Sequence, residues 1–88
     1  DVVTTVKGKG RILIVEDEVL LRDVSKEMLV TLGYQVDEAC DGREAVEKIT
    51  AFPDQWDVVL MDLSMPRLGG EEALKIIRDL HQDLKIVI

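Results

Sequence analysis

The chain alternates between short apolar runs and longer segments in which apolar residues recur with helical spacing. Continuous apolar runs are typical of strands buried on both faces of a parallel sheet, whereas the helical spacing is typical of amphipathic helices. We expect strands at residues 11–16, 34–39, 57–61 and 85–88, and helices at residues 19–32, from 41 to the break at Pro53-Asp54, and at 70–80.

Local signals support these boundaries. Gly33 directly follows the first helical pattern and can supply its left-handed C-cap. Asp41 and Glu44 have the spacing of a capping box, which predicts the start of the second helix. The buried stripe of that helix should consist of Ala45, Ile49 and Phe52.

Strands that alternate with helices through short loops predict an α/β fold with right-handed crossovers. We expect a flavodoxin-like, doubly wound parallel sheet of order 2-1-3-4, which lacks the fifth strand and the last helices of that fold. Residues 11–88 should form this one incomplete domain. Residues 1–10 end in Gly8-Lys9-Gly10, and we interpret them as a linker from an upstream domain of a longer protein.

Composition narrows the class of partner. A net charge of -7 opposes direct nucleic-acid binding, which requires clustered Lys and Arg, and favours proteins and cations as partners. No apolar stretch is long enough to span a membrane, and we expect neither a signal peptide nor membrane contact by this domain. The single cysteine, Cys40, fits a reducing compartment such as the cytoplasm, and we interpret it as a small buried residue.

Acidic residues follow two of the predicted strands. Glu16 and Asp17 come after the first strand, and Asp62 comes after the third. The order 2-1-3-4 makes these strands neighbours, so their acidic residues should lie near one another. Two carboxylates about 4 Å apart repel by roughly 4 kcal/mol at an effective dielectric near 20. Carboxylates, a loop carbonyl and water suit Mg2+. With the metal bound, one carboxylate can accept a phosphoryl group to form an aspartyl phosphate.

Further motifs occur in a fixed order along residues 11–88. They are Glu16-Asp17, Gly33-Tyr34, Asp41-Gly42 followed by Ala45, the segment Leu60-Met61-Asp62-Leu63-Ser64-Met65-Pro66, and Gly70. Together these motifs resemble the receiver domains of two-component response regulators, in which a histidine kinase donates phosphate to an aspartate.

The resemblance implies a role for each matching residue. Asp62 would be the phosphoacceptor, Asp17 a direct Mg2+ ligand, Glu16 a ligand acting directly or through water, and the backbone carbonyl of Ser64 a further ligand. The donor would be a histidine kinase or a phosphotransfer protein in a phosphorelay. The domain would then be a phosphate acceptor rather than a conventional enzyme, and it could belong to a hybrid sensor histidine kinase.

The chain also departs from the family pattern. Receivers carry a Ser or Thr after the fourth strand, a Lys after the fifth and a final helix, and these 88 residues contain none of them. Lys7, Lys9 and Lys85 precede strands, so they should lie at the opposite end of the sheet and cannot replace the missing Lys.

Two alternatives remain open. A phosphohydrolase of the haloacid-dehalogenase type also forms an aspartyl phosphate. That family is characterised by an Asp-x-Asp pattern, whereas here the second position after Asp62 is Ser64. A phosphate-independent docking or pseudo-receiver module is the other. Without the last elements, part of the apolar face of helix 19–32 and the edge of strand 85–88 would be bare, which predicts a homodimer formed through that strand or by exchange of elements.

Overall fold

The computed structural model describes residues 10–61, 70–81 and 83–87, and all the expected helices and strands are present in them. The elements are β1 (Arg11–Val15), α2 (Val19–Thr31), β2 (Gln35–Ala39), α3 (Gly42–Ala51), β3 (Val58–Met61), α4 (Gly70–Leu80) and β4 (Ile86–Val87). Their ends differ from the expected ends by at most two residues.

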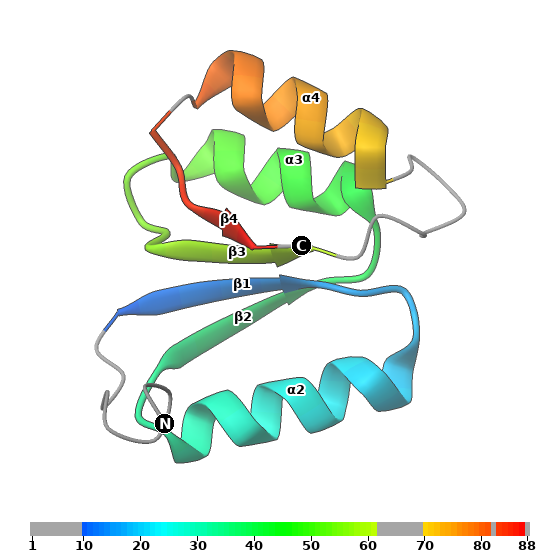
Figure 1. Cartoon of the computed structure of the whole chain (residues 1–88), viewed down its shortest axis with the longest axis vertical. Helices are drawn as coiled ribbons and strands as arrows, with labels where there is room; N and C mark the ends of the chain where they lie inside the picture. The colour runs from blue at the N-terminus through cyan, green and yellow to red at the C-terminus, as the bar shows by residue number, and fades with distance from the viewer. Residues whose placement is uncertain (1–9, 62–69, 82, 88) are drawn as a thin grey trace.

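The strands form one parallel sheet in the order β2-β1-β3-β4, which confirms the predicted flavodoxin-like order (Figure 1). The register pairs Val15 of β1 with both Ala39 of β2 and Met61 of β3. Because all pairs are parallel, the carboxyl ends of these three strands lie side by side at one edge of the sheet.

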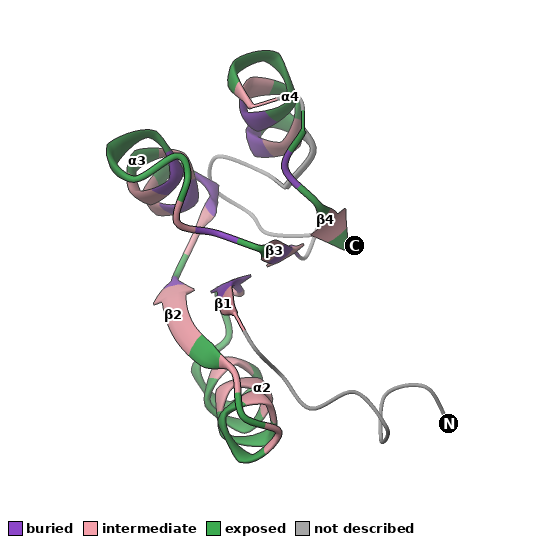
Figure 2. Cartoon of the chain, turned by 90° about the vertical axis from the view of Figure 1, so that its left-hand side faces the viewer, coloured by how far each residue is buried: buried purple, intermediate pink, exposed green. Residues whose placement is uncertain are grey.

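Helices cover the two faces of the sheet unequally. Figure 2 shows α2 alone on one face, and α3 and α4 together on the other. The buried core lies mainly on the two-helix side, where alternate strand residues meet the helices. Its members include Leu13, Val15, Val59, Met61, Ala45, Ile49, Ala73 and Ile77. This face therefore supplies most of the apolar burial that stabilises the domain.

The turns at the ends of the helices follow the predicted chemistry. After α2, Gly33 has φ 102°, and the amides of Gly33 and Tyr34 donate to the carbonyls of Val30 and Leu29 at 3.0 and 3.1 Å. This pattern is a Schellman motif, which satisfies the last carbonyls of a helix and requires a residue that tolerates positive φ. The prediction of a glycine C-cap is confirmed.

The capping box that starts α3 is present in a modified form. The carboxylate of Asp41 accepts a hydrogen bond from the Glu44 amide at 2.8 Å, as predicted. The Glu44 carboxylate reaches back to the amide of Cys40 at 2.6 Å, one residue before the N-cap. Both carboxylates therefore satisfy backbone donors at the transition from β2 to α3.

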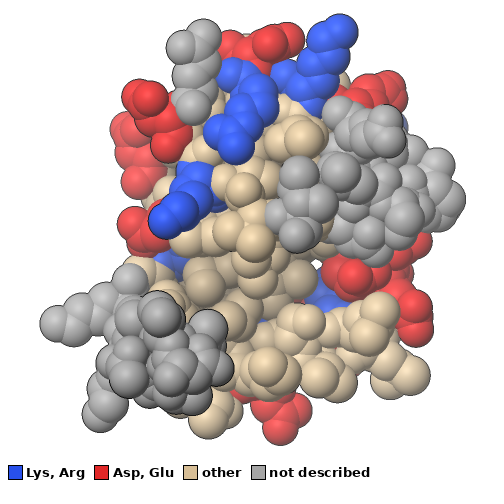
Figure 3. Space-filling view, in the orientation of Figure 1, with Lys and Arg blue, Asp and Glu red and all other residues tan. Residues whose placement is uncertain are grey.

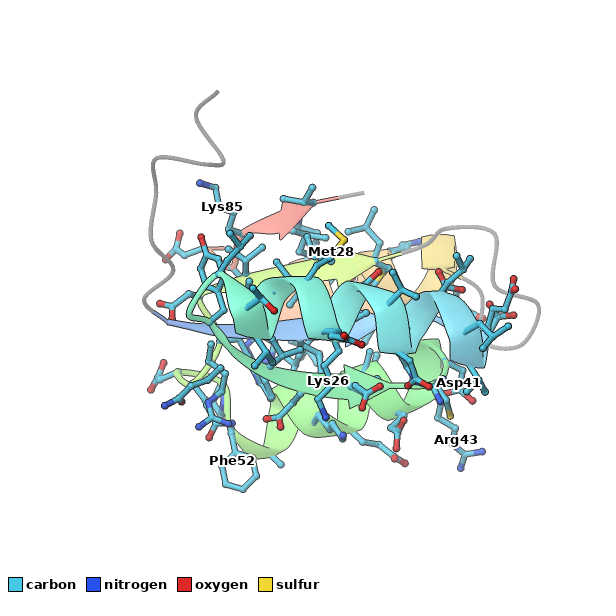
Figure 4. The ribbon with its side chains drawn as sticks, turned by 90° about the horizontal axis from the view of Figure 1, so that it is seen from below. Lys26, Met28, Asp41, Arg43, Phe52 and Lys85 are labelled. Carbon is cyan, nitrogen blue, oxygen red and sulfur yellow. The ribbon has the colours of Figure 1, made fainter. Side chains whose placement is uncertain are left out.

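Two burial predictions were wrong. Phe52 is 59% exposed because α3 ends at Ala51, and the non-helical backbone of Phe52 turns its ring away from the stripe formed by Ala45 and Ile49. Figure 4 shows its ring extending outward. Cys40 is exposed because the edge strand β2 ends one residue earlier, at the buried Ala39.

One face of α2 is apolar, and none of the described residues 10–61, 70–81 and 83–87 covers it. No residue of α2 is buried, and Leu21, Val24 and Met28 are 51%, 56% and 62% exposed. Figure 4 shows Met28 on the side of α2 toward β4 and Lys26 on the opposite side. This observation agrees with the expected bare face of the first helix.

Candidate functional site

The candidate site lies where β1 and β3 end. The last residues of these strands, Val15 and Met61, are direct partners in the parallel pairing. Glu16 follows the first of them in the sequence, and Asp62 follows the second. Asp62 and Ser64 fall in the stretch 62–69, outside the described residues, so their predicted roles stay predictions.

Glu16 is held through its backbone and its side chain. Its amide donates to the carbonyl of Ala39 in β2 at 3.0 Å, which continues the ladder one residue beyond β1. Its carboxylate accepts from the amide of Glu18 at 3.1 Å, and its carbonyl accepts from the guanidinium of Arg22 at 2.9 Å. The half-buried Glu16 is therefore an ordered part of the loop between β1 and α2.

Asp17 is exposed at the turn between Glu16 and Glu18. Carboxylate oxygens are hard donors, so this pair suits Mg2+ better than a transition metal. Within the described ranges, which omit 62–69, no group of three Asp, Glu, His or Cys side chains is arranged to hold a metal ion. Glu16 and Asp17 thus fit as two ligands of a site that needs further oxygen donors.

A cavity of about 360 Å³ adjoins the end of β1 on the side covered by α2. It is lined by Ile14, Val15, Glu16, Ser25, Leu60, Met61 and Val87. Its floor is the apolar face of the sheet, and Glu16 is the acidic member of its lining. The candidate site therefore borders an apolar groove that runs from Glu16 toward β4.

Sequence reasoning missed a cluster of charges beside the site, centred on Glu38 of β2. The two carboxylate oxygens of Glu38 lie 3.2 Å from Nε of Arg22 and 3.3 Å from Nζ of Lys26. Its backbone carbonyl accepts a hydrogen bond from Nζ of Lys48. The spacing of Arg22 and Lys26 places them on one side of α2, but only the packing of α2 against β2 brings Glu38 between them.

The exposed Cys40 lies at the rim of this cluster, in a cavity of about 430 Å³ that Glu38 and Lys48 also line. Partial desolvation raises the pKa of the Cys40 thiol, and the hydrogen bond and charge of Glu44 raise it further, as does the charge of Asp41. A raised pKa keeps the sulfur protonated at neutral pH, and the thiol is a weak nucleophile in that form.

Lys85, which directly precedes β4, does not reach the candidate site. Figure 4 shows Lys85 at the end of the sheet away from Asp41, which marks the carboxyl end of β2. This placement agrees with the expectation that Lys85 cannot serve the acidic edge. Lys7 and Lys9 lie outside the described residues.

Part of the surface carries no charged side chains. Figure 3 shows uncharged atoms across the middle of the face on which Figure 1 places β4 and α2, with acidic side chains around much of the rim. Among the described helices, none has the length and apolar character needed to cross a bilayer.

Comparison with known proteins gives consistent results. The family model of the response regulator receiver domain matches residues 12–88. The chemotaxis protein CheY of Thermotoga maritima is 39% identical over 79 residues, which are 89% of this chain and 64% of that protein. The sensor kinase CckA of Brucella abortus is 34% identical over 96% of this chain and 9% of its own length.

Solved structures agree in fold. The response regulator TrrA of Thermotoga maritima, solved in complex with Mg2+ and BeF, has a TM-score of 0.82 and 39% identity over 91% of this chain and 68% of its own. TrrA in complex with the histidine kinase ThkA has a TM-score of 0.79 and 40% identity over 89% of this chain and 66% of that one. The chain thus spans about two thirds of the length of these relatives.

Proposed function

The chain belongs to the response regulator receiver domain family, and from this premise we propose that Asp62 accepts a phosphoryl group from a histidine kinase or phosphotransfer protein in a two-component phosphorelay. The in-register ends of β1 and β3 carry the proposal, because they bring the strand that precedes Asp62 beside the strand that precedes Glu16 and Asp17.

In the proposed reaction, a carboxylate oxygen of Asp62 attacks the phosphorus of a phosphohistidine. The bond between phosphorus and the donor's imidazole nitrogen breaks, and that nitrogen keeps the electron pair and is reprotonated. The product is an acyl phosphate on Asp62 and a free histidine on the donor. Similarity to a response regulator solved with its histidine kinase supports a donor of this kind.

We propose that Glu16, Asp17, Asp62 and the backbone carbonyl of Ser64 hold Mg2+, directly or through water. When bound, the ion would neutralise charge on the transferring phosphoryl oxygens. The observed hard oxygen donors of Glu16 and Asp17 at the end of β1 support this assignment, as does the relative solved with Mg2+ and BeF.

The test compares the wild type with Asp62→Asn, which keeps the shape of the side chain and removes its charge. Acetyl phosphate with Mg2+ should label the wild type, and hydroxylamine should release the label, because an acyl phosphate is cleaved by that nucleophile. Asp54→Asn, at an exposed acid between α3 and β3, is the matched control and should be labelled like the wild type. Equal labelling of D62N would remove Asp62 from the role.

The exposed apolar face of α2 supports association with a second copy of the chain. The apolar face of α2 includes Leu21, Val24 and Met28, and Met28 lies on the side of α2 toward the edge strand β4, where Val87 is 46% exposed. Exposed apolar patches and unpaired strand edges favour association. We therefore propose a homodimer formed through β4 or by exchange of elements.

A phosphate-independent docking module is the second candidate, and the exposed α2 face is the observation that favours it. It differs from the first in one outcome, because binding of a protein partner would be unchanged by acetyl phosphate and by D62N. Both candidates operate in a reducing compartment, for which we propose the cytoplasm, in agreement with the exposed free thiol of Cys40.

A further inference from the structure

We propose that Arg22 is a positioning residue of the Mg2+ site, because it holds the backbone carbonyl of Glu16. The inference rests on the proposed function, since it concerns how the loop that carries Glu16 and Asp17 is presented to the ion. In this role the Arg22 side chain acts through the Glu16 backbone and needs no contact with Mg2+ or the phosphoryl group.

Arg22 joins three parts of the fold at once. It lies in the first part of α2, and its backbone amide makes the ordinary helical hydrogen bond to the Glu18 carbonyl at 3.0 Å. Its guanidinium extends back past the start of the helix, where one nitrogen donates to the Glu16 carbonyl at 2.9 Å and Nε donates to Glu38 of β2 at 3.2 Å. The side chain is only 17% exposed, so water competes weakly for these contacts.

The contact with Glu16 determines how the loop leaves the sheet. The Glu16 amide is bonded to Ala39 of β2, and the Glu16 carbonyl is bonded to Arg22. That carbonyl belongs to the same planar peptide unit as the amide nitrogen of Asp17. Holding it in place therefore sets the plane from which the backbone of Asp17 continues, on an exposed turn that has little packing of its own.

Glu38 keeps the guanidinium in this orientation. Its carboxylate is shared by Arg22 and Lys26, and its carbonyl is held by Lys48 of α3. A guanidinium donates from several nitrogens spread across one plane, whereas an ammonium group donates from a single nitrogen. Lys26 pairs with the other oxygen of Glu38, and its side chain donates to Glu38 rather than to Glu16.

This difference makes Lys26 a matched control. Arg22→Gln removes both the contact with Glu38 and the contact with the Glu16 carbonyl, whereas Lys26→Gln removes only a contact with Glu38. Residues that orient metal ligands from behind typically change metal affinity by about 10- to 100-fold when they are removed. A residue that merely stabilises the fold would change the unfolding midpoint without changing how strongly the folded protein binds the ion.

The experiment measures two quantities on the wild type, R22Q, R22K and K26Q. The first is the Mg2+ dissociation constant from titration calorimetry, and the second is the rate of labelling by acetyl phosphate as a function of Mg2+ concentration. We expect R22Q to weaken Mg2+ binding by about tenfold and to raise the Mg2+ concentration for half-maximal labelling by the same factor. The rate at saturating Mg2+ should be close to that of the wild type.

We expect K26Q to change the Mg2+ dissociation constant by less than about twofold, as for other partly exposed ion pairs. R22K should lie between the wild type and R22Q, because a compact ammonium group lacks the spread of nitrogens with which the guanidinium reaches Glu38 and the Glu16 carbonyl together. Circular dichroism checks that each variant is folded. If R22Q does not fold, R22K alone decides the matter, and unchanged Mg2+ affinity in R22K overturns the proposal.

Equal Mg2+ affinity in R22Q and K26Q would also overturn it, as would a lower saturating rate with an unchanged dependence on Mg2+. Failure of the proposed function has a different signature. In that case the wild type itself neither binds Mg2+ nor becomes labelled, and the role of Arg22 is overturned together with that of the site.

Discussion

Val15 and Met61 are direct partners at the ends of two adjacent parallel strands, β1 and β3. The chain leaves the sheet after each of them into an acidic residue, Glu16 in one case and Asp62 in the other. Parallel pairing in this register makes two segments far apart in the sequence end at the same edge. This relationship is the geometric basis for the proposed Mg2+ site and for the predictions that concern it.

Mg2+ should raise the thermal unfolding midpoint of the wild type, because an ion that binds only the folded state stabilises that state. At about 100 times the dissociation constant the gain should be about 2.7 kcal/mol. Asp17→Asn should lose most of this gain, whereas Asp23→Asn, at an exposed acid within α2, should keep it. Differential scanning fluorimetry measures the midpoints.

The control for this measurement is NaCl at matched ionic strength, since screening a net charge of -7 also stabilises the folded state. An identical effect of Mg2+ on the wild type and D17N would mean that the ion acts only by screening. That result would contradict a role of Asp17 as a ligand.

Association should depend on the apolar face of α2. Met28→Lys places a charge on a side chain that is 62% exposed, so it should cost little stability but shift a dimer toward the monomer. Thr50→Lys, at an exposed position of α3, adds the same charge on the other side of the sheet and should leave association unchanged. Light scattering coupled to size exclusion measures the mass, and a wild type that stays monomeric at high concentration would refute the dimer.

The core between the sheet and α3 should be the most sensitive part of the fold. Ile49 is fully buried, and Ile49→Ala should lower the free energy of unfolding by about 2 to 5 kcal/mol through lost burial and a residual cavity. Leu20→Ala removes the same number of carbon atoms from a side chain that is 73% exposed, and it should change stability far less. Urea denaturation measures both, and equal losses would contradict the burial of this face.

Cys40 should react slowly at neutral pH although it is exposed, because its raised pKa keeps the thiol protonated. Alkylation by iodoacetamide should accelerate as the pH rises above the usual range of a cysteine pKa. Glu44→Gln removes a charge that raises this pKa, so it should speed the reaction at neutral pH by about two- to tenfold. Mass spectrometry measures the adduct.

Glu44→Gln keeps an oxygen that can accept from the Cys40 amide, so the cap on α3 should survive. A thiol that already reacts as fast as a small unhindered thiol at neutral pH would contradict the raised pKa.

Strand and helix positions followed from local pattern because each element carries its own periodicity and its own punctuation. Gly33 ends α2 and Asp41 starts α3 with the chemistry that these residues make available locally. The strand order was also accessible, since alternating strands and helices with short connections allow few topologies. The acids after β1 and β3 were therefore recognisable as a candidate site from the sequence.

Side-chain burial was less accessible. Phe52 continues the spacing of Ala45 and Ile49, yet the helix ends one residue earlier and its ring is exposed. Cys40 follows a buried alanine, yet it stands past the end of an edge strand. In both cases the deciding event is where an element stops, and periodicity says little about the residue at a boundary.

By itself the sequence determined the order of the elements, the acids that follow β1 and precede α2, and the apolar stripe on α2, because these are properties of neighbouring residues. Only the tertiary structure decided that Arg22 and Lys26 share Glu38, and that Arg22 also holds the Glu16 carbonyl. The physical reason is that such contacts depend on the distance and register between elements far apart in the chain, and local periodicity carries no information about either.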